Sequence, residues 1–163
     1  MNIGKRNLLA GKQFEDEIAE TLNKSRLFPP LGSSQDIDQE ADRRKIDIVP
    51  VKNKDYFKYN IQAKVSTNKL QYPKLLSQMN EVVPIGDVAD KIPVVFHKYN
   101  TKSDKGRYMT RAKYAIMYQE DFIEVIQTLE QYKKAYNELM TYWDSLPDTE
   151  KPGINETLEK LGL

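Results

Sequence analysis

Three polar residues are spaced so that they could share one catalytic face. Gln62 and Lys64 lie two residues apart in a stretch that alternates apolar and polar side chains, so both project from the same face of a strand. Asp47 precedes Gln62 by fifteen positions and lies beside it if the two segments pair. Carboxylate and amide oxygens are hard ligands suited to Mg²⁺ or Mn²⁺, and a neighbouring lysine can orient or deprotonate water. The spacing is compatible with metal-assisted hydrolysis or with the polar face of an ordinary strand.

The amino-acid composition excludes several other kinds of active site. The chain has 163 residues, no cysteine and one histidine, His97. Disulfides, thiol nucleophiles and thiolate metal ligands are excluded, and a histidine-rich zinc site or a Ser-His-Asp triad is disfavoured. His97 follows a predicted strand, so we expect an ordinary edge residue, with a phosphate contact as the alternative. No apolar run approaches the ~18–20 residues of a membrane span, and residues 1–9 lack a signal-peptide apolar stretch. We therefore expect a cytoplasmic protein that does not contact a membrane.

The elements that would position these residues follow from periodicity and turn signals. We predict strands at residues 44–51, 57–66, 92–96 and 114–118, and helices at 7–24, about 68–79, 119–146 and about 155–161. Residues 29–34 read as a loop or an irregular edge, and residues 101–106 as a polar loop. This order favours an α/β or α+β fold with a small mixed central sheet flanked by helices. We expect one domain over residues 1–146, which includes the long helix 119–146, and a C-terminal tail over residues 147–163.

The predicted helix 119–146 carries apolar residues at spacings that alternate three and four, which is a heptad pattern. The stripe consists of Phe122, Val125, Leu129, Tyr132, Tyr136, Leu139, Trp143 and Leu146. One interpretation is a helix that lies across the domain's own sheet. The other is a helix that also pairs with a second subunit, which would make the protein a homodimer.

The order of these motifs resembles that of the PD-(D/E)xK nucleases, the restriction-endonuclease-like superfamily. Residues 11–19 (GKQFEDEIA) are similar to the first helix of archaeal-type Holliday junction resolvases. Residues 61–64 (IQAK) resemble the Mrr-type restriction branch, in which glutamine commonly replaces the second acid. The predicted strand 114–118, followed by residues 120–123 at the start of a helix, also resembles the corresponding part of these nucleases. The resemblance covers roughly residues 8–126.

The resemblance implies a role for each residue of the motif. Asp47 would be the central metal ligand, Gln62 the second ligand, with possible help from the Ala63 carbonyl, and Lys64 the catalytic lysine. Glu15 would be the helix acid, because the resolvase pattern places this acid directly after Phe; Glu17 is the alternative. The implied cofactor is Mg²⁺ or Mn²⁺.

Gln62 departs from the motif of this superfamily, which has a carboxylate at the corresponding position. A neutral amide at this position leaves one negative charge fewer at the metal, so affinity for the ion should fall, and loss of activity is one outcome. Asp36 and Asp38 could substitute as ligands, although a solvated loop is the simpler expectation for the segment that contains them.

Net charge is unevenly distributed along the chain. The total is +1, from 25 Lys and Arg against 24 Asp and Glu. Residues 91–113 contain seven basic and one acidic side chain, whereas residues 114–163 contain four basic and ten acidic ones. Basic residues interleaved with tyrosines suit phosphate contacts, and a solvated loop is the alternative. The predicted DNA-binding residues are Arg43, Arg44, Lys98, Lys102, Lys105, Arg107 and Arg111.

The function that we expect is a metal-dependent DNA endonuclease that acts on duplex or branched DNA. A Holliday junction resolvase-like enzyme of DNA recombination fits the small size, and a small restriction endonuclease fits the glutamine motif. Two other classes stay open. One is a catalytically inactive nuclease-like module that binds DNA or a protein, which Gln62 favours. The other is a coiled-coil interaction protein whose working part is the long helix.

Overall fold

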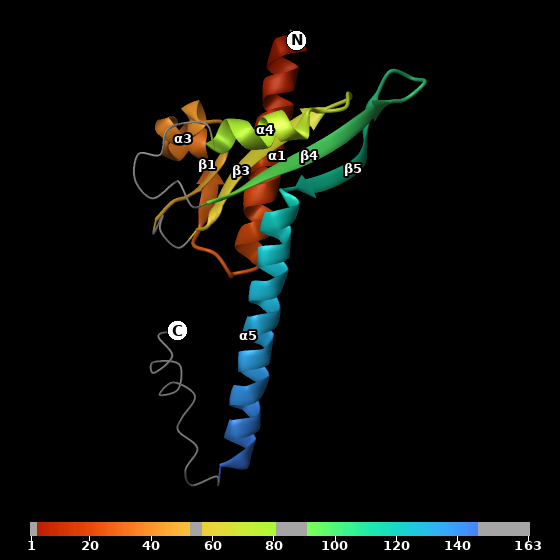
Figure 1. The fold of residues 1–163 in the computed structure, drawn as a ribbon. Helices are drawn as coiled ribbons and strands as arrows, with labels where there is room; N and C mark the ends of the chain where they lie inside the picture. The colour runs from red at the N-terminus through yellow and green to blue at the C-terminus, as the bar shows by residue number, and fades with distance from the viewer. Residues whose placement is uncertain (1–2, 53–56, 81–90, 147–163) are drawn as a thin grey trace. The chain divides into compact units, whose positions relative to one another are not determined.

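The predicted mixed α/β fold is confirmed. The computed structural model describes residues 3–52, 57–80 and 91–146, and the chain divides into two compact units, Met1–Gln119 and Glu120–Leu163. The first unit holds a five-stranded mixed sheet in the order β1-β2-β3-β4-β5 (Figure 1). Its strands are β1 (Leu31–Ser33), β2 (Ile48–Pro50), β3 (Tyr59–Ser66), β4 (Ile92–Lys102) and β5 (Tyr108–Ile116). The helices are α1 (Ile3–Lys24), α2 (Ser34–Ile37), α3 (Gln39–Arg43), α4 (Tyr72–Asn80) and α5 (Gln119–Ser145).

Helices cover the two faces of the sheet. The β3–β4 pair is parallel and the other three pairs are antiparallel. On one face, Phe14 and Ile18 of α1 pack in a core cluster with Ile61 of β3. On the other face, Leu76 of α4 packs with Val95 of β4. These are the apolar faces that the helical and strand periods predicted, and their burial anchors both helices to the sheet.

The β3 strand agrees closely with the predicted strand 57–66, but it is more buried than an amphipathic strand with one solvated face. The side chains of Asn60, Ile61, Gln62 and Ala63 are all buried. The reason is topological, because β3 is hydrogen-bonded to β2 on one side and to the parallel strand β4 on the other. Parallel strands are normally covered on both faces. Polar residues that the alternation assigned to a surface are therefore inside the protein.

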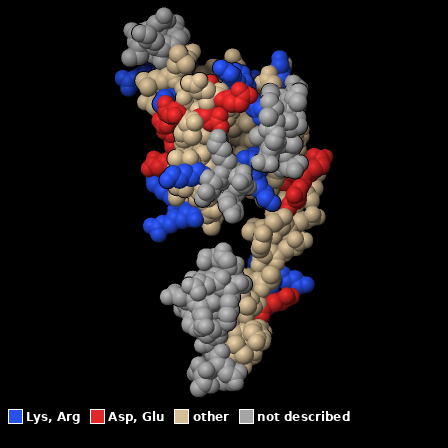
Figure 2. Space-filling model, turned by 90° about the vertical axis from the view of Figure 1, so that its left-hand side faces the viewer, with Lys and Arg blue, Asp and Glu red and all other residues tan. Residues whose placement is uncertain are grey.

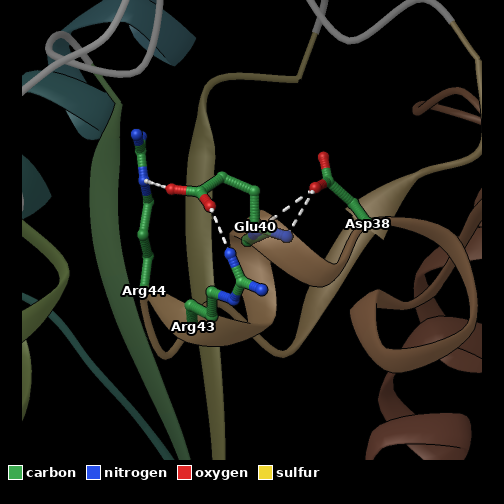
Figure 3. Close-up of polar contacts among 5 residues, drawn as sticks. Asp38, Glu40, Arg43 and Arg44 are labelled. Atoms are coloured by element: carbon green, nitrogen blue, oxygen red, sulfur yellow. Dashed lines mark hydrogen bonds and ion pairs between the residues drawn. The ribbon is translucent and has the colours of Figure 1, made fainter.

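Between α1 and β2, the irregular edge predicted as one alternative for residues 29–34 agrees with β1, an edge strand of the sheet, whereas the predicted strand 44–51 differs from the structure. Residues 29–34 include β1, and α2 and α3 follow before β2, which is shorter than the predicted strand 44–51. Asp38 caps α3 by accepting hydrogen bonds from the backbone N–H groups of Glu40 and Ala41, at 3.1 and 3.2 Å (Figure 3). Lys45 has φ +64°, which turns the chain from α3 toward β2. Elements this short are stabilised by capping residues and by neighbouring segments. They are too short to show a repeating sequence pattern from which they could be predicted.

The predicted loop 101–106 overlaps the turn of a long hairpin, whose strands β4 and β5 are longer than the predicted strands 92–96 and 114–118. The β3–β4 pairing ends at Ser66 and Tyr99, whereas the β4–β5 pairing continues to Lys102 and Tyr108. The end of the hairpin therefore extends past β3 as a two-stranded ribbon (Figure 1). The turn at its tip is closed by Ser103 and Arg107, and Gly106 supplies the positive φ of +73°.

The helices that follow β3 and β5 agree with prediction in type. The α4 helix begins four residues after position 68 and carries Pro73 in its first turn, where proline is tolerated. The α5 helix matches the predicted helix 119–146 to within one residue. None of the helices in the described part of the chain combines the length and apolar character needed to cross a membrane. The predicted terminal helix and tail lie outside the described residues.

Candidate active site

Asp47 lies immediately before β2 and is anchored to β3 through two hydrogen bonds. Its backbone N–H donates to the Ile61 carbonyl at 2.7 Å. Its side-chain Oδ2 accepts from the Ala63 N–H, also at 2.7 Å. Because Ile48 pairs with Ile61 in an antiparallel register, Asp47 lies opposite Gln62. The structure thus brings together Asp47 and Gln62, which the spacing predicted to be neighbours.

Lys64 lies on the same side of this arrangement and forms an ion pair with Asp47. Its Nζ is 3.9 Å from Asp47 Oδ2. The pKa of Asp47 is nevertheless raised to about 6, because burial outweighs the Lys64 charge and the Ala63 hydrogen bond, which both lower it. The negative charge of Glu15 raises the pKa of Asp47 further. A carboxylate whose pKa is raised by burial beside a charged partner is a candidate for a functional site.

Gln62 supplies a buried oxygen without a hydrogen-bond partner in the described structure. Its side chain is 1 % exposed, and Oε1 accepts no hydrogen bond from the described residues. Ser34, whose backbone N–H donates to the Asp47 carbonyl at 2.9 Å, also has an unpartnered buried Oγ. An unpaired buried polar atom costs roughly 1–3 kcal/mol, so both atoms need an explanation. A cation held by Asp47 and Gln62 would satisfy the amide oxygen.

The structure separates Glu15 from Glu17. Glu15 is buried, accepts a hydrogen bond from Ser33 Oγ at 2.8 Å and acts electrostatically on Asp47. Glu17 instead binds Lys113 and Lys98, and these two hydrogen bonds lower its pKa. The two acids differ by two positions on α1, so they lie on different sides of the helix. This arrangement favours Glu15 as the helix acid.

The other acidic residues considered as ligands have different roles. Asp36 pairs with Lys12 at 2.7 Å, and Asp38 caps α3. Over residues 3–52, 57–80 and 91–146, no group of three or more His, Cys, Asp or Glu side chains could hold a metal. The predicted set contains only two carboxylates, Asp47 and Glu15, because Gln62 supplies an amide. Its oxygen donors nevertheless suit a hard cation in type.

His97 is not an edge residue, and that expectation is wrong. It lies in the interior of β4, which continues well beyond residue 96, and it is fully buried. Its Nε2 is hydrogen-bonded to Ser66 Oγ at 3.0 Å and its Nδ1 to Tyr72 OH at 2.8 Å. Burial lowers its pKa. His97 is the register partner of Lys64, so this network ties α4 to the strand that carries the lysine.

Sequence reasoning missed Ser33, Ser34 and the Ala63 N–H as parts of the site. The two serines follow Gly32 in a segment interpreted as a loop or an irregular edge, and nothing in the local pattern links them to α1. Ala63 was expected to contribute its carbonyl, whereas the structure uses its N–H toward Asp47. The one feature of the sequence that could have pointed to Ser33 and Ser34 was the short polar run directly after Gly32.

The predicted DNA-binding residues fall into two groups. Arg44 is buried and binds Glu40 through Nε at 3.2 Å, and Arg43 pairs with the same acid at 3.6 Å (Figure 3). Lys98 binds Glu17 and lies over the ring of Phe14. Arg44 and Lys98 are thus engaged in contacts within the fold, whereas Arg43 forms an exposed surface pair. The other four residues are exposed on the hairpin ribbon: Lys102, Lys105, Arg107 and Arg111.

The basic ribbon is therefore a local feature. Figure 2 shows Lys and Arg side chains interspersed with Asp and Glu on the face that it displays, without a uniformly positive area. The segregation of charge along the sequence thus does not produce a uniformly basic face on this side, because residues distant in sequence are neighbours in the fold. Contacts such as Lys98 with Glu17 illustrate this mixing.

No family model, curated protein sequence or solved structure matches this chain.

Proposed function

We propose that this protein is a metal-dependent DNA endonuclease that hydrolyses phosphodiester bonds. One observation carries the proposal: the partly buried carboxylate of Asp47 lies 3.9 Å from Lys64 Nζ and opposite Gln62, whose buried oxygen has no partner in the described structure. A structural ion pair alone would account for Asp47 and Lys64. It would not account for the unsatisfied amide oxygen beside them.

Asp47, Gln62 and Glu15 would hold Mg²⁺ or Mn²⁺ through oxygen ligands. The ion, when bound, supplies Lewis-acid activation of water and of the scissile phosphate. Ser33 orients Glu15 through its hydrogen bond, and the Ala63 N–H fixes the Asp47 carboxylate. Lys64 positions the attacking water and stabilises the negative charge that develops on the phosphoryl oxygens.

The DNA contact that we propose is the hairpin ribbon. A two-stranded β-ribbon fits the major groove of duplex DNA, and the exposed basic side chains of the ribbon can contact phosphates on either side of it. Phosphate contacts follow the path of the backbone and not its base sequence, which supports recognition of DNA shape, as in a resolvase of branched DNA. The glutamine motif supports a small restriction endonuclease as the alternative substrate class.

Lys64→Ala tests the enzyme proposal. We expect cleavage of DNA in Mg²⁺ or Mn²⁺ to fall by about 10²–10³-fold, because the variant has no charged group to act on the developing oxyanion. The assay should include linear, cruciform and methylated DNA. Lys69→Ala is the matched control, since Lys69 is an exposed lysine after the same strand, and it should cleave normally.

Equal behaviour of Lys64→Ala and the unmodified protein on every substrate would rule out the enzyme. Binding of DNA without any cleavage would instead support the inactive nuclease-like module, which the neutral Gln62 favours. In that case the mobility of labelled DNA in gels would shift although no product forms.

The ribbon can be tested separately through salt dependence. Lys105→Ala/Arg107→Ala should weaken DNA binding and reduce the slope of log affinity against log salt by about 0.9 for each phosphate that the variant no longer neutralises. Fluorescence anisotropy with labelled duplex over a series of salt concentrations measures both quantities. Lys133→Ala/Lys134→Ala removes the same charge from α5 and should leave the slope unchanged. An unchanged slope for the ribbon variant would exclude the ribbon as the phosphate-binding element.

A further inference from the structure

Much of the apolar stripe of α5 is exposed in the structure, and its other members, Val125, Trp143 and Leu146, are half-buried. None of its 27 residues is buried. Leu129, Tyr132 and Tyr136 are 63 %, 71 % and 61 % exposed. Contiguous exposed apolar surface of this kind marks an interaction site. Helices depend on packing of the apolar face for most of their stability in water, so a partner for this stripe is expected.

The stripe has the regularity of a coiled-coil seam. The a positions hold Phe122, Leu129, Tyr136 and Trp143, and the d positions hold Val125, Tyr132, Leu139 and Leu146. Four successive heptads meet the length at which such a pattern indicates a coiled coil. A strict repeat of this type is matched by a helix with the same repeat, because layers of equivalent residues then meet along the entire seam.

The charged side chains of α5 lie almost entirely away from this seam. Positions b, c and f hold Glu120, Glu124, Glu130, Lys134, Glu138 and Asp144. Two ion pairs within the helix, Lys133 with Glu130 and Lys134 with Glu138, involve this outer surface. Only Asp121, at a g position, and Lys133, at an e position, flank the stripe. A like-charged second copy can therefore approach along the seam without close repulsion.

The same positions indicate the direction of pairing. In a parallel, in-register pair, g and the following e position of the partner are neighbours. Asp121 then faces Ile126 of the second copy, and Lys133 faces Thr128. In the antiparallel pair that aligns the same layers, Lys133 faces Lys133. We propose that α5 mediates dimerisation with a second copy of this chain, as a parallel, in-register coiled coil.

Sedimentation equilibrium of the full chain, without DNA or metal, tests the dimer. The mass should be that of two chains, and Leu129→Glu should raise the dissociation constant by about 100-fold or more, because the dimer then buries two leucines fewer. Gln127→Glu, at an outer f position, adds the same charge and should leave the mass unchanged. A monomeric full chain would overturn the proposal, as would a dimer that Leu129→Glu does not weaken. A mass of three or more chains would also overturn it.

Disulfide trapping tests the direction, and it is simple because the chain contains no cysteine. Val125→Cys should form a covalent dimer with itself under mild oxidation, since equivalent d positions meet in a parallel pair. In the antiparallel pair Val125 would face Trp143, so a mixture of Val125→Cys and Trp143→Cys would cross-link while Val125→Cys alone would not. That second pattern would contradict the parallel arrangement.

Discussion

Asp47→Asn is expected to reduce metal-dependent DNA cleavage by about 10³-fold or more. The asparagine retains an oxygen that can accept the Ala63 N–H hydrogen bond, so the junction of β2 and β3 should keep its geometry. The variant lacks the negative charge that would bind the cation. The measurement is the rate of DNA cleavage in Mg²⁺ or Mn²⁺, together with the change in melting temperature on adding the ion. The unmodified protein should be stabilised by the ion, and the variant should not.

The same substitution should stabilise the metal-free protein at neutral pH. The pKa of Asp47 is raised from 3.8 to about 6, with burial as the largest cause. The folded state therefore holds this proton more tightly than the unfolded state does. The contribution of Asp47 to stability is fully present below the unfolded pKa and is lost as pH rises through the folded pKa. Asparagine carries no charge to bury, so its advantage should grow to about 2–3 kcal/mol above pH ~7.

Chemical denaturation at several pH values checks this sign. The gain in the free energy of unfolding should be small near pH ~4 and largest above pH ~7. Asp16→Asn is the matched control, because Asp16 is an exposed acid on α1, and its stability should follow the unmodified protein. A variant that is less stable than the unmodified protein at pH ~7.5 would show that the Lys64 ion pair outweighs burial.

Gln62→Glu is expected to act oppositely to Asp47→Asn: it should strengthen metal binding and destabilise the metal-free protein. A second carboxylate beside Asp47 should tighten the affinity for Mg²⁺ or Mn²⁺ by about tenfold or more, because one more negative charge faces the ion. Without metal, the same charge is buried next to Asp47, so the free energy of unfolding should fall by several kcal/mol. Isothermal titration with the ion and denaturation in chelator measure the two effects.

Asn60→Asp provides the control for this substitution. Asn60 lies two residues before Gln62 on the same face of β3, is also buried and has an unpartnered Nδ2 in the described structure. A carboxylate at this position should destabilise the metal-free protein without a gain in metal affinity. If Gln62→Glu and Asn60→Asp bind the ion equally, the amide of Gln62 does not face a metal site.

The alternation of apolar and polar residues over 59–66 was sufficient to predict β3 and to place Gln62 and Lys64 on one face. This worked because the two-residue period of a strand is a local property. The heptad spacing predicted α5 in the same way. Local periods also gave α1, and its Phe14 and Ile18 do face the core. Asp47 was brought to Gln62 by an inferred pairing that the register of β2 and β3 agrees with.

Contacts between residues far apart in the chain could not be read from local patterns. Glu15 and Glu17 lie on different sides of α1, but only distant partners show which side belongs to the site: Ser33 binds Glu15, whereas Lys98 and Lys113 bind Glu17. His97 looked like a strand end because β4 continues into polar residues whose pairing with β5 keeps them extended. Burial of Gln62 likewise requires β4, which lies later in the chain and pairs with β3 at this position. The candidate ligands are thus evident from residue type and spacing, whereas their desolvation, and with it the raised pKa of Asp47, exists only once distant segments pack around them.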